Sequence, residues 1–87
     1  MASYRLELKA SAAKEIERVS SKADRRRIVE KTGGLAENPR GHGTEKLAGY
    51  EDRYRVRQGD YRIVYLTDDR KVTVTIYKVG HRRDVYR

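Results

Sequence analysis

Arginines gather in the second half of the chain, at a spacing that allows several of them to act on one anion. One set lies on two segments that a short turn joins, and it consists of Arg55, Arg57 and Arg62. A second set follows near the C-terminus: Arg82, Arg83 and Arg87. Preorganised guanidinium groups stabilise the negative charge that phosphoryl oxygens gain during phosphodiester cleavage. The pattern therefore favours a site that holds a scissile phosphodiester.

Two further side chains near the C-terminus suit such a site. His81 carries an imidazole, which can transfer a proton near neutral pH, and Tyr86 can stack on an unpaired base. We therefore expect a cationic pocket that holds one imidazole and one phenol. The structural alternative is that the arginines are solvated or paired with acids such as Glu51, Asp60 or Asp68, and that Tyr86 only packs against its neighbours.

Other kinds of catalytic site have little support. His42 lies between two glycines and is interpreted as a loop residue, and Cys is absent. Two widely separated histidines without cysteine do not suit a transition-metal site, so we expect neither metal nor cofactor. The serines fall in the expected first strand or at helix caps, so nucleophilic catalysis has little support.

Composition points to a polyanionic partner. The 87 residues carry a net charge of +8, and Arg outnumbers Lys by 14 to 7. Arg forks onto phosphate and stacks on bases, so this balance favours nucleic acid over a role in solubility alone. The length fits one domain over residues 1–87. No apolar run is long enough for a membrane span or a signal-peptide core, so we expect a location in the cytoplasm of a bacterium or archaeon.

The first half of the chain predicts a strand and two helices. Residues 3–9 alternate as a half-buried strand, whose apolar side holds Tyr4, Leu6 and Leu8. Ser11 is expected to cap a helix over 12–19, with its core contacts at Ala13, Ile16 and either Val19 or Ser20. Ser21 is expected to cap a second helix, with Asp24 completing the capping arrangement.

The second helix has a buried stripe and a predicted end. The stripe comprises Ile28, Thr32, Leu35 and Ala36, with Val29 alongside. Gly33 and Gly34 weaken a helix and offer an alternative, earlier end. Pro39 terminates whatever remains, because it pushes Asn38 out of the helical region.

The second half changes to the period of two that is typical of strands. After a loop over 40–44, Tyr54 and Val56 alternate with three arginines: Arg53, Arg55 and Arg57. Residues 61–67 form a strand that is apolar on both faces. Residues 72–79 form a further strand, in which Val72, Val74 and Ile76 alternate with more polar residues. Short turns make this run a three- or four-stranded antiparallel meander.

These elements predict an α+β domain with both helices on one face of the sheet. The last strand should pair with the strand that carries Arg62. Because residues 61–67 are apolar on both sides, the second face of that strand must be partly covered or must form an interaction patch.

Several segments together resemble the RelE/ParE toxin superfamily, and within it the RelE branch. They are the stretch from Pro39 through Lys46-Leu47, "YRVR" at 54–57, "GDYRIVY" at 59–65 and "VGHRRDVY" at 79–86. Each motif is weak alone, but the set spans nearly the whole chain. The resemblance implies a twisted antiparallel sheet with two helices on one face and a basic face that receives RNA.

The resemblance also implies a function. It implies cleavage of mRNA in the ribosomal A site by the RNA 2′-hydroxyl, and a cognate antitoxin protein as partner. By position, Arg62 matches the family's phosphate-stabilising arginine and Arg82 the arginine that serves the leaving group. Tyr86 matches the tyrosine that orients the substrate. We assign RNA binding to the further cations Lys46, Arg53 and Arg83.

The sequence departs from the better-known members at two points. Arg55 and Arg57 stand where those proteins have lysines, and the segment from Arg82 to Tyr86 is slightly shorter. A guanidinium stays protonated at neutral pH and is a poor proton acceptor, so an electrostatic role suits these two residues better. The departure makes His81 a candidate for proton transfer.

Three functions remain open from the sequence. The first is a ribosome-dependent endoribonuclease. The second is a ParE-like toxin that poisons gyrase by binding, and the third is an RNA-binding domain whose arginines hold phosphates without turnover. A pure binder has no chemical reason to assemble Arg62, Arg82 and Tyr86, which favours the nuclease.

Overall fold

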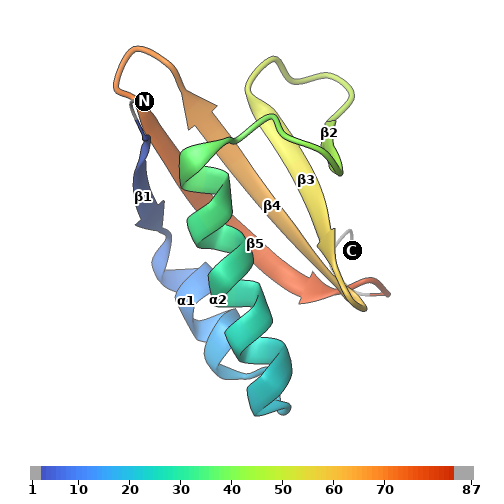
Figure 1. Cartoon of the computed structure of the whole chain (residues 1–87). Coiled ribbons are helices and arrows are strands. Elements are labelled where there is room, and N and C mark those ends of the chain that lie inside the picture. The colour runs from blue at the N-terminus through green and yellow to red at the C-terminus, as the bar shows by residue number, and fades with distance from the viewer. Residues whose placement is uncertain (1–2, 84–87) are drawn as a thin grey trace.

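The computed structural model describes residues 3–83, which form two helices and one five-stranded sheet (Figure 1). In chain order the elements are β1 (Arg5–Leu8), α1 (Ala10–Glu17), α2 (Lys22–Glu37), β2 (Thr44–Lys46), β3 (Arg53–Gln58), β4 (Tyr61–Asp68) and β5 (Thr73–His81). The strand order is β1-β5-β4-β3-β2. Both helices lie on one face of the sheet, which confirms the predicted α+β architecture.

The first helix begins earlier than the sequence predicts, and the Ser11 cap is wrong. Lys9 occupies the cap position in an extended conformation, without a side-chain capping hydrogen bond. Its backbone N–H donates to the carbonyl of Ile76 at 2.9 Å. Because β1 is still bound to β5 at this point, the chain turns directly from strand into helix. The buried residues of α1 are consequently Ala12 and Ile16, and Ala13 is only partly buried.

The second helix follows the prediction closely. The Ser21 side chain accepts the backbone N–H of Asp24 at 3.2 Å, and the buried residues are Ile28, Thr32 and Leu35. The helix continues through both glycines to Glu37. Val29 was expected beside the buried stripe, but it is 55% exposed on the outer side of the helix.

Strands β2 to β5 form the predicted antiparallel meander, and β4 pairs with β5 as expected. The start of β5 differs, because Val72 lies in the turn with φ +52° and is 40% exposed. The Asp68 carboxylate accepts the N–H groups of Arg70 and Lys71, and these bonds hold the turn. Regular pairing therefore resumes only at Thr73.

Strand β1 adds a parallel edge to the sheet. It pairs with β5 from Arg5 opposite Thr73 to Leu8 opposite Ile76. The sheet is therefore mixed, whereas the sequence predicted only the antiparallel run. Leu8, expected on the apolar side with Tyr4 and Leu6, is exposed. Neither of the two described helices is long and apolar enough to cross a membrane.

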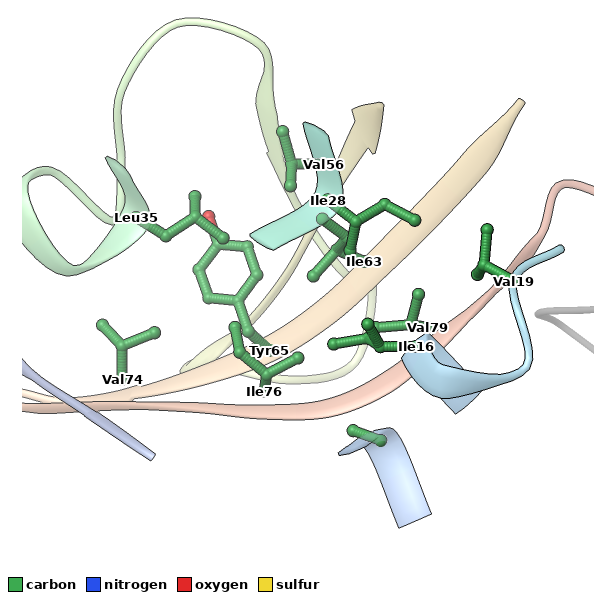
Figure 2. Close-up of a cluster of buried hydrophobic side chains, with 11 residues drawn as sticks. Ile16, Val19, Ile28, Leu35, Val56, Ile63, Tyr65, Val74, Ile76 and Val79 are labelled. Carbon is green, nitrogen blue, oxygen red and sulfur yellow. The ribbon is translucent and has the colours of Figure 1, made fainter. Parts of the chain in front are cut away.

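The core lies between the helices and the sheet, with Tyr65 of β4 among its fully buried residues (Figure 2). The other side chains drawn in the figure include Ile16, Ile28, Leu35, Val56, Ile63, Val74, Ile76 and Val79. The Tyr65 hydroxyl donates to the carbonyl of Pro39, just after α2. Burial raises the pKa of Tyr65 to about 12. One buried hydroxyl therefore ties the end of α2 to the central strand.

Tyr65→Phe should lower the free energy of unfolding by about 1–3 kcal/mol, because the Pro39 carbonyl loses its donor in a buried place. The raised pKa of Tyr65 means that the folded state disfavours the phenolate. This contribution is present below pH 10, the ordinary tyrosine value, and is lost as the pH rises towards about 12. Urea unfolding of both proteins across this range should show the difference shrinking with pH. A difference that is constant with pH would contradict the assignment.

Candidate active site

The face of the sheet opposite the helices carries the first set of predicted arginines, Arg55, Arg57 and Arg62. We call it the open face. Alternation along β3 places Arg53, Arg55 and Arg57 on this face, and the β3–β4 turn brings Arg62 back directly opposite Arg57. Gly59 forms that turn with φ +61°, in the left-handed region that favours glycine. The positioning of these cations therefore follows from local sequence.

Three of these arginines line one depression of about 280 Å³. Its lining residues are Gly43, Glu45, Arg55, Val56, Arg57 and Arg62. Glu45 of β2 accepts a hydrogen bond from Arg55 at 2.9 Å. Arg57 donates to the Gly59 carbonyl at 3.1 Å, and Arg62 to the Tyr61 carbonyl at 3.4 Å. A guanidinium carries five N–H donors, so these contacts orient Arg57 and Arg62 and leave donors for an anion.

The arrangement concentrates like charges. Arg57 and Arg62 are directly opposite across neighbouring strands, and like charges in that relation destabilise a sheet. Folding alone gives no reason for such a pair, whereas an anionic ligand does. The depression can therefore hold a phosphate group between guanidinium donors on two strands.

Strand β4 has apolar residues on both faces, and those on the open face are partly covered by neighbouring side chains. Val64 points to this face yet is buried. The register places it between Arg55 and Lys78, whose aliphatic stems can cover an apolar neighbour while their charges remain in water. Leu66, further along β4, is only partly buried and stays accessible.

Arg82 lies at the same end of the sheet as this depression. Its backbone N–H donates to the Asp60 carbonyl at 2.8 Å, which holds the segment after β5 against the β3–β4 turn. Its side chain is exposed. The backbone of Arg82 is thus bonded to Asp60, and the preceding residue, Gly59, is the one whose carbonyl Arg57 contacts. Tyr86 and Arg87 lie outside the described residues.

His81 lies on the opposite face of the sheet from Arg62. Its ring packs edge-on against Tyr61, with centroids 5.8 Å apart, and it lines a separate depression of about 200 Å³ with Glu15 of α1 and Arg18 just after that helix. Its Nδ1 accepts the N–H of Arg83 at 3.3 Å. The expectation that the imidazole shares the arginine pocket is therefore wrong. Arg62 pairs with Gly80, so the next residue points to the other side.

The three cations assigned to RNA binding are spread over the molecule. Arg53 is on the open face, where its guanidinium lies over the rings of Tyr50 and Tyr77. Lys46 is exposed and pairs with Tyr54, which places it on the helix side of the edge strand β2. Arg83 is exposed just after β5. The structure thus places Arg53 on the same face as the arginine depression, and Lys46 on the opposite face.

Sequence reasoning missed the role of Arg40, which lies in the predicted loop. Its guanidinium donates to the Tyr54 hydroxyl at 3.0 Å, to Thr67 at 3.2 Å and to both oxygens of Asp69. Hydrogen bonds from Tyr4 and Arg40 lower the pKa of the Asp69 carboxyl. Hydrogen bonds to the hydroxyls of Tyr54 and Tyr4, and then to Asp69, raise the pKa of Arg40. The cluster fixes the segment after α2 to the sheet. No local pattern marks it, because its partners come from distant parts of the chain.

Comparison with known proteins gives one consistent result. The family model for the ParE toxin of the type II toxin–antitoxin system parDE matches residues 6–86. Toxin RelE of Mycobacterium tuberculosis is 31% identical over 84 residues, which are 97% of this chain and 87% of that protein.

Solved structures agree with this result. The archaeal RelE of Pyrococcus horikoshii, solved in complex with RelB, has a TM-score of 0.82 at 28% identity, and the match covers 95% of this chain and 99% of that one. The isolated RelE toxin of Escherichia coli has a TM-score of 0.79 at 32% identity, over 95% and 90%. The fold, the motifs and these matches agree, and the chain belongs to the RelE/ParE family of toxins of type II toxin–antitoxin systems.

Proposed function

We propose that this toxin is a ribosome-dependent endoribonuclease that cleaves mRNA in the A site and so inhibits translation in the cytoplasm. The observation that carries the proposal is the depression on the open face where Arg55, Arg57 and Arg62 meet. Guanidinium groups on two strands suit a phosphodiester whose charge increases during reaction. Their mutual repulsion is offset when that anion is bound.

The proposed reaction is an internal transfer of the phosphoryl group. The 2′-oxygen of one nucleotide attacks the adjacent phosphorus, the bond from phosphorus to the 5′-oxygen breaks, and a 2′,3′-cyclic phosphate remains. The 2′-hydroxyl loses a proton, and the departing 5′-oxygen gains one. In this scheme Arg62 stabilises the phosphoryl oxygens, with Arg55 and Arg57 adding electrostatic support. Arg82 serves the leaving group, and Tyr86 stacks on and orients the substrate.

Dependence on the ribosome follows from what the depression lacks. Among the residues that the structure describes, its lining side chains are arginines, Val56 and a Glu45 that is bonded to Arg55, and these give no evident acid–base pair. Catalysis must then rest mainly on charge and on alignment of the 2′-oxygen with the bond that breaks. Alignment of reacting groups can supply several kcal/mol of rate acceleration, on the order of 7–11 in favourable cases. The ribosome can provide it by holding the mRNA.

Purified protein incubated with programmed ribosomes should therefore cut the mRNA at A-site codons, whereas naked mRNA at the same concentration should stay intact. Primer extension maps the cuts, and assay of the 3′ ends should find cyclic phosphate. Equal cleavage of naked and ribosome-bound mRNA would contradict the dependence on the ribosome. The absence of cuts in both would contradict the nuclease.

The matching family model describes a ParE toxin, and this favours one alternative, a toxin that poisons gyrase by binding. Such a toxin requires no phosphate-stabilising constellation. A gyrase supercoiling assay run beside the ribosome assay separates the two functions. Inhibition of gyrase without mRNA cleavage would establish the alternative.

A cognate antitoxin is part of the proposal. Solved relatives include RelE bound to RelB from Pyrococcus horikoshii, and this chain carries a net charge of +8. An acidic, amphipathic partner segment would neutralise that charge and mask the basic face. Restraint of this kind is needed because a free nuclease would stop translation in its own cell.

A further inference from the structure

The open face has a second depression beyond the arginine site. It measures about 270 Å³ and is lined by Lys9, Arg53, Leu66, Thr75 and Tyr77. The Arg53 guanidinium carbon lies 4.3 Å from the ring centroid of Tyr50 and 5.4 Å from that of Tyr77. Tyr50, in the loop between β2 and β3, is 48% exposed. A guanidinium thus contacts two aromatic rings on a face that no described helix covers.

The chemistry of this cluster suits an unpaired base. Aromatic rings and guanidinium planes are the surfaces on which single-stranded RNA bases stack. The depression is also cationic, since Lys9 and Arg53 line it and none of its lining residues within 3–83 is acidic. By register one neighbouring carboxylate is that of Glu7, opposite Thr75, and it is bonded to Arg5 at 2.8 Å.

The two depressions lie on the same face, beside successive arginines of β3. Arg53 and Arg57 face the same way on β3, four residues apart, which corresponds to about 13 Å. Arg55 lies between them and lines the first depression. A nucleic-acid strand held by its phosphates at Arg57 can therefore run over Arg55 to reach Arg53.

We propose that Tyr50, Arg53 and Tyr77 form a base-stacking subsite for an unpaired nucleotide that flanks the scissile position. The occupant is single-stranded RNA continuous with the strand bound at the arginine depression. Identifying that RNA as the substrate rests on the proposed nuclease function. The subsite itself rests on three observations: the contacts of Arg53 with two rings, the exposure of Tyr50, and the location of the cluster on the same face as the arginine depression.

Binding of non-cleavable RNA tests the subsite without the ribosome. The probes are single-stranded oligoribonucleotides with 2′-O-methyl groups. One is short enough to fill only the arginine depression, one spans both depressions, and a third matches the second but lacks bases beyond the first depression. The chain has no Trp and seven Tyr, so tyrosine fluorescence can be followed without tryptophan, and quenching that is larger with the long probe than with the short one reports stacking beyond the first depression. Affinity comes from fluorescence anisotropy of labelled probes.

Tyr77→Leu should weaken binding of the long probe by about five- to hundredfold, the loss typical for one stacked base. Binding of the short and abasic probes should not change. Tyr77→Phe keeps the ring and should bind like wild type. The salt dependence of long-probe binding should keep its slope in Tyr77→Leu, because no phosphate contact is lost, and should become shallower in Arg53→Gln.

The pair Tyr50→Leu and Tyr50→Phe repeats the test at a loop residue, where substitution is not expected to prevent folding. Thermal unfolding checks that every variant is folded. Equal losses for short and long probes, equal losses for Phe and Leu, or no binding of the long probe by wild type would each overturn the subsite. The nuclease is judged separately. If the wild-type protein binds the probes as expected but leaves ribosome-bound mRNA intact, the nuclease alone is contradicted. If it cleaves the mRNA but the tyrosine substitutions do not change binding of the long probe, the subsite alone is contradicted.

Discussion

Replacing Arg62 by Ala should lower the single-turnover rate of mRNA cleavage on the ribosome by about 10²-fold or more. Removal of one preorganised donor to a developing oxyanion costs an enzyme about this much. Arg62 stands opposite Arg57 in the depression on the open face, so it is placed to contact a phosphoryl oxygen. Arg82→Ala should have an effect of the same order if it serves the departing 5′-oxygen. Quench-flow or manual single-turnover assays with saturating toxin measure both.

Controls separate chemistry from docking and from folding. Arg70→Ala removes the same charge from an exposed turn between β4 and β5, and its rate should stay close to wild type. Ribosome binding of Arg62→Ala should change far less than its rate. Its thermal stability should be unchanged or slightly higher, because one of two opposed like charges is gone. An Arg62→Ala protein that loses ribosome binding yet keeps its cleavage rate would show that this residue only docks the toxin.

Arg57→Ala and His81→Gln should give opposite results. Arg57 lines the depression with Arg62, and its loss should lower the single-turnover rate by about 10²-fold. His81 faces the other side of the sheet, against Tyr61 and α1, so His81→Gln should be nearly silent. The wild-type rate should then show no imidazole inflection between about pH 5.5 and 8. The pH–rate profiles of the three proteins provide the measurement.

A catalytic role of His81 predicts a different result in the same assays. If His81 transfers a proton in the reaction, His81→Gln should lower the rate by about 10²- to 10⁴-fold, the usual range for a positioned acid or base. The wild-type profile should then contain an inflection that the variant lacks. Both observations together would require the His81 ring to leave Tyr61 in the ribosome-bound state.

Local patterns in the sequence were sufficient for much of the fold and for the centre of the site. Alternation over 53–57 predicted the basic strand face, and the short turn between the two arginine-bearing segments predicted that Arg62 returns beside it. The Ser21 cap and the stripe at Ile28, Thr32 and Leu35 predicted the second helix. Each of these features depends on residues within a few positions of one another, and so their geometry follows from backbone periodicity alone.

The tertiary structure decided what depends on pairing between distant segments. The start of α1 is set by the bond from Lys9 to Ile76, and the hydrogen bonds of Arg40 reach as far as Asp69. The β4–β5 register places Gly80 opposite Arg62 and so turns His81 away from the arginines. A shift of one residue in that register would reverse the face of every side chain beyond it. Local sequence does not encode this register, because contacts across the whole sheet select it.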